Sequence, residues 1–108
     1  MKIEASESGG IKVMALSGEV DLSHSPVLRK ALMELMFERR DVVVDLAAVG
    51  YIDSSGVAGL VEAYQMARKN GTRFTLAAIS EPVRRVLQLA RLDRVFTIAD
   101  TVEAALKG

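Results

Sequence analysis

The chain has 108 residues, with 14 basic and 14 acidic side chains that leave no net charge, one histidine and no cysteine. This length suits a single domain, residues 1–108, and the balanced charge provides no overall field that would attract nucleic acid or an anionic membrane. The lack of cysteine excludes disulfides and thiolate chemistry, and no apolar run approaches the roughly 20 residues that cross a bilayer, so a cytoplasmic location is expected.

The first third of the chain predicts a β-hairpin followed by a helix. Residues 2–5 and 11–16 each suit a short strand, and the Gly9-Gly10 pair between them favours a tight turn, which places an antiparallel strand at one edge of a sheet. Ser25-Pro26 predicts a helix start, with serine as the N-cap and proline in the first turn. One apolar face recurs at helical spacing and consists of Leu28, Ala31, Leu32, Leu35 and Met36.

Residues 41–64 are the stretch around which the rest is organised. The run Val42-Val43-Val44 lacks polar alternation, which is typical of a central strand covered on both faces. A short loop is expected after Asp45-Leu46, and Asp53-Ser54-Ser55-Gly56 then starts a helix that ends at Asn70-Gly71. The apolar positions of this helix are Val57, Leu60, Val61, Tyr64 and Ala67.

The last third predicts two further strands and two helices. Residues 73–79 suit a strand, and Ser80-Glu81-Pro82 repeats the combination of N-cap and proline at a helix start. Residues 95–98 suit a short final strand, and Asp100 with Glu103 has the spacing of a capping box for the last helix. The helix after Ser80 is expected to place Val83, Val86, Leu87 and Ala90 inward and Arg84, Arg85 and Arg91 outward, as a solvated face.

These elements predict an α/β fold: a single domain with a mixed, mainly parallel sheet, an antiparallel edge hairpin and about four helices. Right-handed crossovers between parallel strands bring the carboxyl ends of those strands to one edge. Asp21, the turn at residues 53–56 and Ser80 are therefore expected at that edge, where open α/β sheets usually bind their ligands. Three loops are expected to converge on Ser54.

Ser54 has two interpretations at the start of its helix. Asp and Ser side chains accept hydrogen bonds from the free N–H groups of a first turn, so a capping role alone accounts for the Asp53-Ser54-Ser55-Gly56 sequence. A phosphate on Ser54 would instead face those N–H groups and the positive end of the helix, which hold an anion with little refolding.

The segment 41–59, DVVVDLAAVGYIDSSGVAG, resembles the signature segment of STAS domains, and most closely that of the bacterial anti-sigma factor antagonists. The resemblance extends over almost the whole chain, including Gly18-Glu19-Val20-Asp21 and the segment 80–87, SEPVRRVL. In that family an aliphatic strand leads to Asp-Ser-Ser-Gly and the first serine is phosphorylated. The resemblance thus implies that Ser54 is the phosphorylation site.

The resemblance also implies partner switching. Unphosphorylated members bind an anti-sigma factor that is also a serine kinase of the GHKL ATPase class, and so free a sigma factor for RNA polymerase; the kinase phosphorylates the serine and a PPM-type phosphatase restores it. By the same match, Asp21 lies where the family has an acidic residue at the kinase contact, while Asp53, Ser55 and Gly56 shape the acceptor turn. The alternative is a STAS regulatory subunit of a transporter, for example in lipid transport, or a stressosome-like scaffold.

The first turns of the helix after Ser54 carry more apolar surface than one buried face requires, because no charge occurs before Glu62. Val57 and Leu60 are therefore expected to contribute to a partner-docking face. The alternative is that the small residues among them let the helix lie close to the sheet.

An enzymatic function is the third interpretation of the chain, after the sigma-factor regulator and the transporter subunit or scaffold. His24, Ser54 and either Asp21 or Asp53 nominally supply a base, a nucleophile and an acid. However, the residues around Ser54 lack the flanking glycines of a nucleophile elbow, so no enzymatic activity is expected and His24 is interpreted as an exposed loop residue. No metal-ligand spacing or phosphate-binding glycine motif occurs, so no metal or cofactor is expected either.

Overall fold

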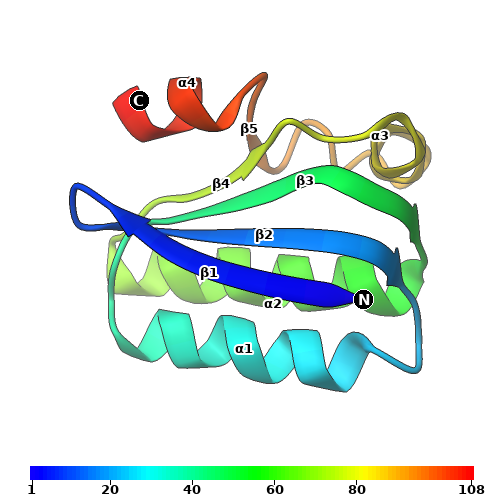
Figure 1. Ribbon diagram of the computed structural model, residues 1–108, viewed down its shortest axis with the longest axis horizontal. Coiled ribbons are helices and arrows are strands. Elements are labelled where there is room, and N and C mark those ends of the chain that lie inside the picture. The colour runs from blue at the N-terminus through cyan, green and yellow to red at the C-terminus, as the bar shows by residue number, and fades with distance from the viewer.

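The structure is a computed structural model that describes residues 1–108. One five-stranded sheet, in the order β1-β2-β3-β4-β5, forms its centre (Figure 1). Its strands are β1 (Lys2–Ser8), β2 (Ile11–Val20), β3 (Val42–Ile52), β4 (Phe74–Ala77) and β5 (Thr97–Ala99). The helices are α1 (Ser25–Phe37), α2 (Ser54–Asn70), α3 (Glu81–Leu89) and α4 (Val102–Lys107). The predicted α/β fold is confirmed.

The edge hairpin is also confirmed. β1 pairs antiparallel with β2, and all later neighbours in the sheet pair in parallel. Gly9 and Gly10 form the turn with φ angles of 56° and 84°, a left-handed region that glycine adopts without steric cost. The connections between parallel strands therefore run through α1, α2 and α3 in turn.

Three predicted strand ends are wrong, because β1 continues past Ala5 to Ser8, and β2 and β3 continue far beyond Leu16 and Leu46. The loop expected before Asp53 is strand: Gly18 pairs with Val49, and Val20 pairs with Ile52. Two irregularities in the register absorb the extra length, and Gly18 takes a φ of 86° between them. As a result β2 and β3 reach the same edge together, and the turns that follow them lie next to each other.

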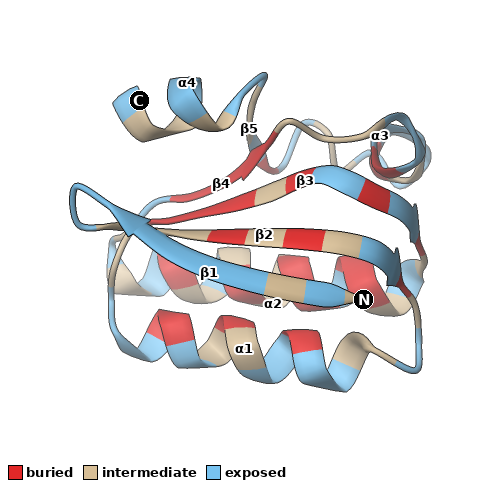
Figure 2. Cartoon of the chain, in the orientation of Figure 1, coloured by how far each residue is buried: buried red, intermediate tan, exposed pale blue.

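The core lies between the sheet and the helices. α1 and α2 lie side by side against one face of the sheet, and their buried positions face it (Figures 1 and 2). The three valines at 42–44 are all buried, as expected for a central strand. The predicted apolar faces are mostly confirmed, since Leu28 and Leu32 in α1 and Leu60 in α2 are completely buried.

Helix starts were predicted to within one residue, but the capping groups differ. The N-cap of α1 is His24 rather than Ser25, and the N-cap of α4 is Thr101, whose hydroxyl accepts from Ala104 N, rather than Asp100. Ser80 is the N-cap of α3 as predicted, yet its hydroxyl does not cap the helix; it donates to the carbonyl of Val49 over 2.6 Å. This bond ties the start of α3 to β3.

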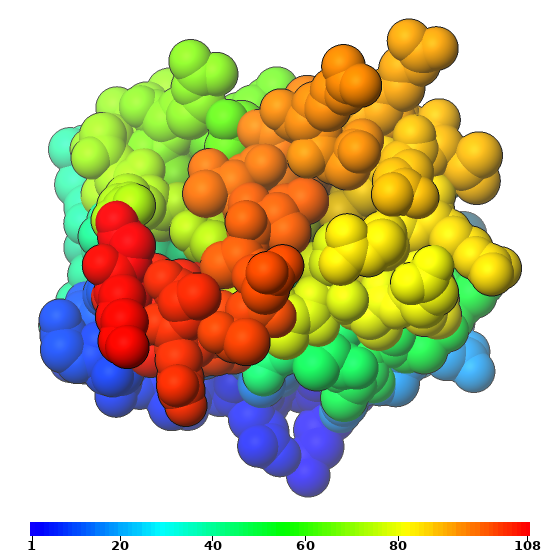
Figure 3. Space-filling view, turned by 90° about the horizontal axis from the view of Figure 1, so that it is seen from above, coloured from blue at the N-terminus to red at the C-terminus, as the bar shows by residue number.

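α3 packs against β3, and α4 packs against β3, β4 and β5. Figure 3 shows this side of the molecule, with α3 in yellow to orange, the chain leading into β5 in orange and α4 in red. The arginines 84, 85 and 91 are exposed, as predicted. No helix combines the length and hydropathy that a bilayer span requires.

Candidate functional site

Asp53 caps α2. Its Oδ1 accepts hydrogen bonds from the backbone N–H of Ser55 (3.0 Å), from that of Gly56 (3.2 Å) and from the Ser55 hydroxyl. These bonds satisfy two of the N–H groups that the first turn of a helix leaves free. The interpretation of Asp53 as a helix cap is therefore confirmed.

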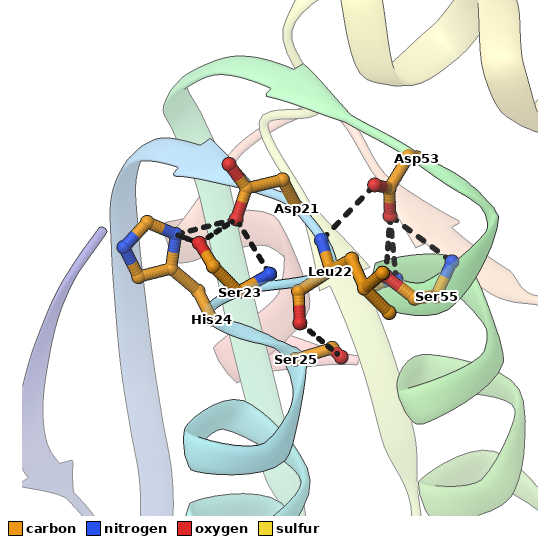
Figure 4. Close-up of polar contacts among 8 residues, drawn as sticks. Asp21, Leu22, Ser23, His24, Ser25, Asp53 and Ser55 are labelled. Carbon is orange, nitrogen blue, oxygen red and sulfur yellow. Dashed lines mark hydrogen bonds and ion pairs between the residues drawn. The ribbon is translucent and has the colours of Figure 1, made fainter.

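Asp53 also joins the two neighbouring turns. Its second oxygen, Oδ2, accepts a hydrogen bond from the backbone N–H of Leu22 (3.1 Å), and its own N–H donates to the carbonyl of Val20 (3.2 Å). The carboxylate thus connects the turn before α1 with the start of α2 (Figure 4), and the backbone N–H of the same residue bonds to the end of β2.

Asp21 organises the turn before α1. Its Oδ1 accepts hydrogen bonds from the backbone N–H and the hydroxyl of Ser23 and lies 2.7 Å from Nδ1 of His24. The turns at Asp21 and Asp53 were predicted to lie at the same edge of the sheet. The hydrogen bond from the backbone N–H of Leu22 to Asp53 confirms this prediction. Ser80 reaches β3 at Val49, three residues before the end of that strand.

Both carboxylates are held in their charged form. The Ser55 hydroxyl, followed by the backbone N–H groups of Gly56, Ser55 and Leu22, lowers the pKa of Asp53 against the opposing effect of desolvation. The Ser23 hydroxyl, followed by His24, lowers the pKa of Asp21 in the same way. This edge of the sheet therefore carries two negative charges at neutral pH.

Ser54 and Ser55 have different environments. Ser54 is exposed at the first position of α2, whereas Ser55 is partly buried and its hydroxyl donates to Asp53. The expectation that a phosphate on Ser54 would find the N–H groups of the helix free needs correction, because Asp53 already accepts from Ser55 and Gly56. An anion on Ser54 would lie beside a carboxylate and in solvent.

Val57 and Leu60, expected at a docking face, and Gly56, expected to shape the acceptor turn, all lie on the buried side of α2. Gly56 and Val57 are buried and Leu60 is completely buried, so they hold α2 against the sheet. A Cβ on Gly56 would lie 2.8 Å from Cγ1 of Val20 and 2.9 Å from Cγ1 of Ile52, closer than atoms can pack. Gly56 is therefore one of the small residues that let α2 lie close to the sheet.

A groove runs from Ser54 between α2 and α3. Its apolar wall is made by Val57, Ala58, Val61, Val86 and Ala90, and its volume is about 500 Å³. Ala58 is exposed and Val61 partly so, which makes these residues the reachable apolar surface next to Ser54. Neither Ala58 nor Val61 is predicted as a site residue from the sequence, because helical spacing alone does not show which side of α2 remains open after α3 packs.

The structure does not place His24 with Ser54. The imidazole contacts Asp21 and Ser23, and its side chain is 38% exposed. His24 is thus a partly buried N-cap residue rather than a fully exposed loop residue. No group of three or more His, Cys, Asp or Glu side chains has the arrangement of a metal site.

The five-stranded sheet and the capped serine turn after its central strand define the class of protein. The chain matches the STAS domain family over residues 2–105 and belongs to that family. It is 29% identical over 92 residues to the anti-sigma-B factor antagonist of Bacillus subtilis (strain 168). The aligned residues make up 85% of this chain and 84% of the relative. It is 27% identical to the anti-sigma F factor antagonist of Paenibacillus polymyxa, over 98% of this chain and 92% of the relative.

Solved structures share the fold. An anti-sigma factor antagonist from Mycobacterium paratuberculosis superposes with a TM-score of 0.90 at 29% identity, covering 98% of this chain and 91% of that one. The phosphorylated form of SpoIIAA from Bacillus (TM-score 0.77, 20% identity, 98% and 97% covered) has the same fold. A sulfate transporter family protein from Wolinella succinogenes has it too (0.78, 19%, 93% and 84%). At 20% and 19% identity, the likeness to these last two structures concerns the fold alone.

Proposed function

We propose that this chain is an anti-sigma factor antagonist whose unphosphorylated form binds an anti-sigma factor and releases a sigma factor, and that phosphorylation of Ser54 prevents this binding. The observation that carries the proposal is the exposed Ser54 at the start of α2, beside Asp53 and at the mouth of the groove between α2 and α3. The names of the relatives that match most of the chain support it over a transporter subunit or a scaffold.

Ser54 is the better phosphate acceptor of the two adjacent serines. A kinase needs a hydroxyl that can reach its nucleotide, and the Ser55 hydroxyl is engaged by Asp53 and partly buried. The Ser54 hydroxyl has neither constraint, because Ser54 is exposed at the first position of α2. Ser54 acts in this proposal as an acceptor and not as a catalyst.

Phosphorylation would act through charge. A phosphate adds about −1.5 to −2 charges at neutral pH. Ser54 adjoins Asp53, and Asp21 lies at the same edge of the sheet, so the added charge meets two existing carboxylates. Burying an unpaired charge in an interface costs roughly 2–5 kcal/mol, or about thirty- to several-thousand-fold in affinity, which suffices for a switch.

The proposed partners are an anti-sigma factor with serine kinase activity of the GHKL type and a PPM-type phosphatase that restores Ser54. Asp21, Asp53 and Ser55 contribute to the surface that the partner covers, and Gly56, Val57 and Leu60 set the position of α2 behind it. Because sigma factors act on RNA polymerase, the proposed location is the cytoplasm.

Phosphorylation mapping tests the acceptor. The protein is incubated with ATP and candidate kinases, and the modified residue is located by mass spectrometry. We expect the phosphate on Ser54, and no label in the Ser54→Ala variant. Labelling confined to other residues would end the proposal.

Calorimetry with the same kinase tests the switch. Ser54→Ala should bind as the unphosphorylated protein does, whereas Ser54→Asp and the phosphorylated protein should bind at least about thirtyfold more weakly. Equal affinity of Ser54→Ala and Ser54→Asp would show that charge at this position does not control docking.

A further inference from the structure

A polar cavity lies at the opposite end of α2 from Ser54. It has a volume of about 220 Å³ and lies between the last turns of α2, the start of β4 and the start of β5. In Figure 3 this corner is where the yellow-green end of α2 meets the orange chain at β5. Fourteen residues of helix at about 1.5 Å each separate Ser54 from Arg68, so the two sites are about 20 Å apart.

Two arginines line this cavity, and neither forms an ion pair with an acidic side chain. Arg68 and Arg73 both contribute to its wall, and neither takes part in any of the ion pairs of the structure. The carboxylate of Asp41 accepts from the backbone N–H of Arg73 and not from its guanidinium. Nη2 of Arg73 lies 3.5 Å from the position that a Cβ would take on Gly108, just after α4. Neither arginine is thus neutralised by an acidic side chain.

The rest of the wall supplies hydrogen-bonding groups over an apolar floor. Tyr64, Thr72, Thr75 and Thr97 line the cavity together with Ala67 and Phe74. Thr75 is the one polar residue of the chain that is buried, with 7% of its surface exposed, and it stands beside Thr97 in the register of β4 and β5. Tyr64 packs edge-to-face against Phe96, with the centroids of the two rings 5.5 Å apart.

A role in offsetting the helix dipole explains only one of the arginines. Arg68 lies in the last turn of α2, where a basic residue is favourable. Arg73 lies beyond the helix, past the left-handed Gly71 that ends it, and lines the same cavity. Two arginines from different elements thus line one polar cavity, and the planar fork of N–H donors on each guanidinium suits the oxygens of a phosphate-type oxyanion.

We propose that Arg68 and Arg73 hold a small phosphate-type oxyanion, inorganic phosphate or a small phosphomonoester, in the cavity between α2, β4 and β5. The volume sets the size of the ligand, because sites for drug-sized molecules occupy about 300–1,000 Å³ and this cavity is smaller. The site is separate from Ser54 and does not depend on the function proposed for that residue.

Titration of the isotope-labelled protein with inorganic phosphate, at constant ionic strength maintained with chloride, tests the site by NMR. We expect saturable shifts of the backbone amides of residues 72–75 and 97, and the same affinity in Ser54→Ala. A parallel titration with glycerol phosphate identifies the source: tighter binding indicates a phosphomonoester, and equal or weaker binding indicates the free ion.

The double variant Arg68→Gln/Arg73→Gln should bind phosphate at least about tenfold more weakly, since each charged hydrogen bond contributes substantially to such a site. Arg85→Gln is the matched control, because Arg85 is exposed on α3 and does not line the cavity. The proposal is overturned if the shifts do not saturate, or if the double variant and Arg85→Gln bind phosphate as the parent protein does.

Discussion

The backbone N–H of Leu22 donates to Oδ2 of Asp53 over 3.1 Å, although the two residues are 31 positions apart in the chain. The other oxygen of the same carboxylate caps α2 through Ser55 and Gly56. The turn before α1 and the start of α2 therefore share one acceptor. A change at Asp53 must affect both turns, and with them the surroundings of Ser54.

Asp53→Ala should lower the thermal stability of the protein in a pH-dependent manner. Hydrogen bonds from Ser55, Gly56 and Leu22 lower the folded pKa of Asp53 below its ordinary value of 3.8. A lowered pKa means that the stabilisation is complete above the unfolded value and is lost as the pH falls through the folded one. The difference in Tm between the parent and the variant should thus be largest near neutral pH and shrink in acid below the ordinary pKa.

Asp100→Ala provides the control for this experiment. Asp100 is exposed and precedes the N-cap of α4 without capping it. Thermal melts of all three proteins over a series of pH values should show the effect in Asp53→Ala alone. A Tm difference for Asp53→Ala that stays constant down to strongly acidic pH would contradict a contribution from the charged carboxylate.

Gly56→Ala should destabilise the protein by about 1–3 kcal/mol, the usual cost of overpacking. The new methyl group would lie 2.9 Å from the carbonyl oxygen of Val20, which belongs to the backbone of β2 and cannot move aside easily. Urea unfolding measures the change.

Gly59→Ala is the matched variant, one turn further along α2. A Cβ there meets no atom within 4 Å, so the substitution should stabilise the helix by about 0.5–1 kcal/mol through the lower entropy of the unfolded chain. Similar effects of the two substitutions would refute the close packing of α2 on the sheet at Gly56.

Local patterns predicted much of this fold. The valine run at 42–44 is buried as its lack of alternation indicates, and the Gly9-Gly10 turn closes the expected hairpin. The full length of β2 and β3 could not be predicted, because Ser17-Gly18-Glu19 interrupts the apolar pattern and the pairing continues only through register irregularities that involve both strands.

In the candidate site, too, local sequence predicts some features, and others depend on tertiary packing. The role of Asp53 as a cap follows from local chemistry, since a carboxylate before a first helical turn finds its donors two and three residues later. The bond from Leu22 and the groove beside Ser54 depend on how distant elements pack. Leu60 shows the same limit: it fits the helical apolar stripe, but only the tertiary structure places it entirely inside.

Ser54→Asp should leave the fold and its stability nearly unchanged. The side chain is exposed, and the N–H groups of Ser55 and Gly56 are already bonded to Asp53, so the new carboxylate neither enters the core nor takes over the cap. We expect the same circular dichroism spectrum and an unfolding free energy within about 0.5 kcal/mol of the parent, as for ordinary surface substitutions. A loss of several kcal/mol would mean that a charge at this position acts by unfolding the domain, and not by blocking association.

Ala58→Glu should weaken binding of the anti-sigma factor by about tenfold or more without destabilising the chain. Ala58 is exposed and lines the groove one turn after Ser54, so a partner that covers Ser54 and the groove would have to desolvate the new carboxylate. Ala104→Glu introduces the same charge at an exposed position of α4, outside this groove, and should leave the affinity unchanged. Calorimetry with both variants separates a local contact from a general effect of charge. If both variants bind as the parent does, the partner does not use the groove, and docking must be confined to the turns held together by Asp21 and Asp53.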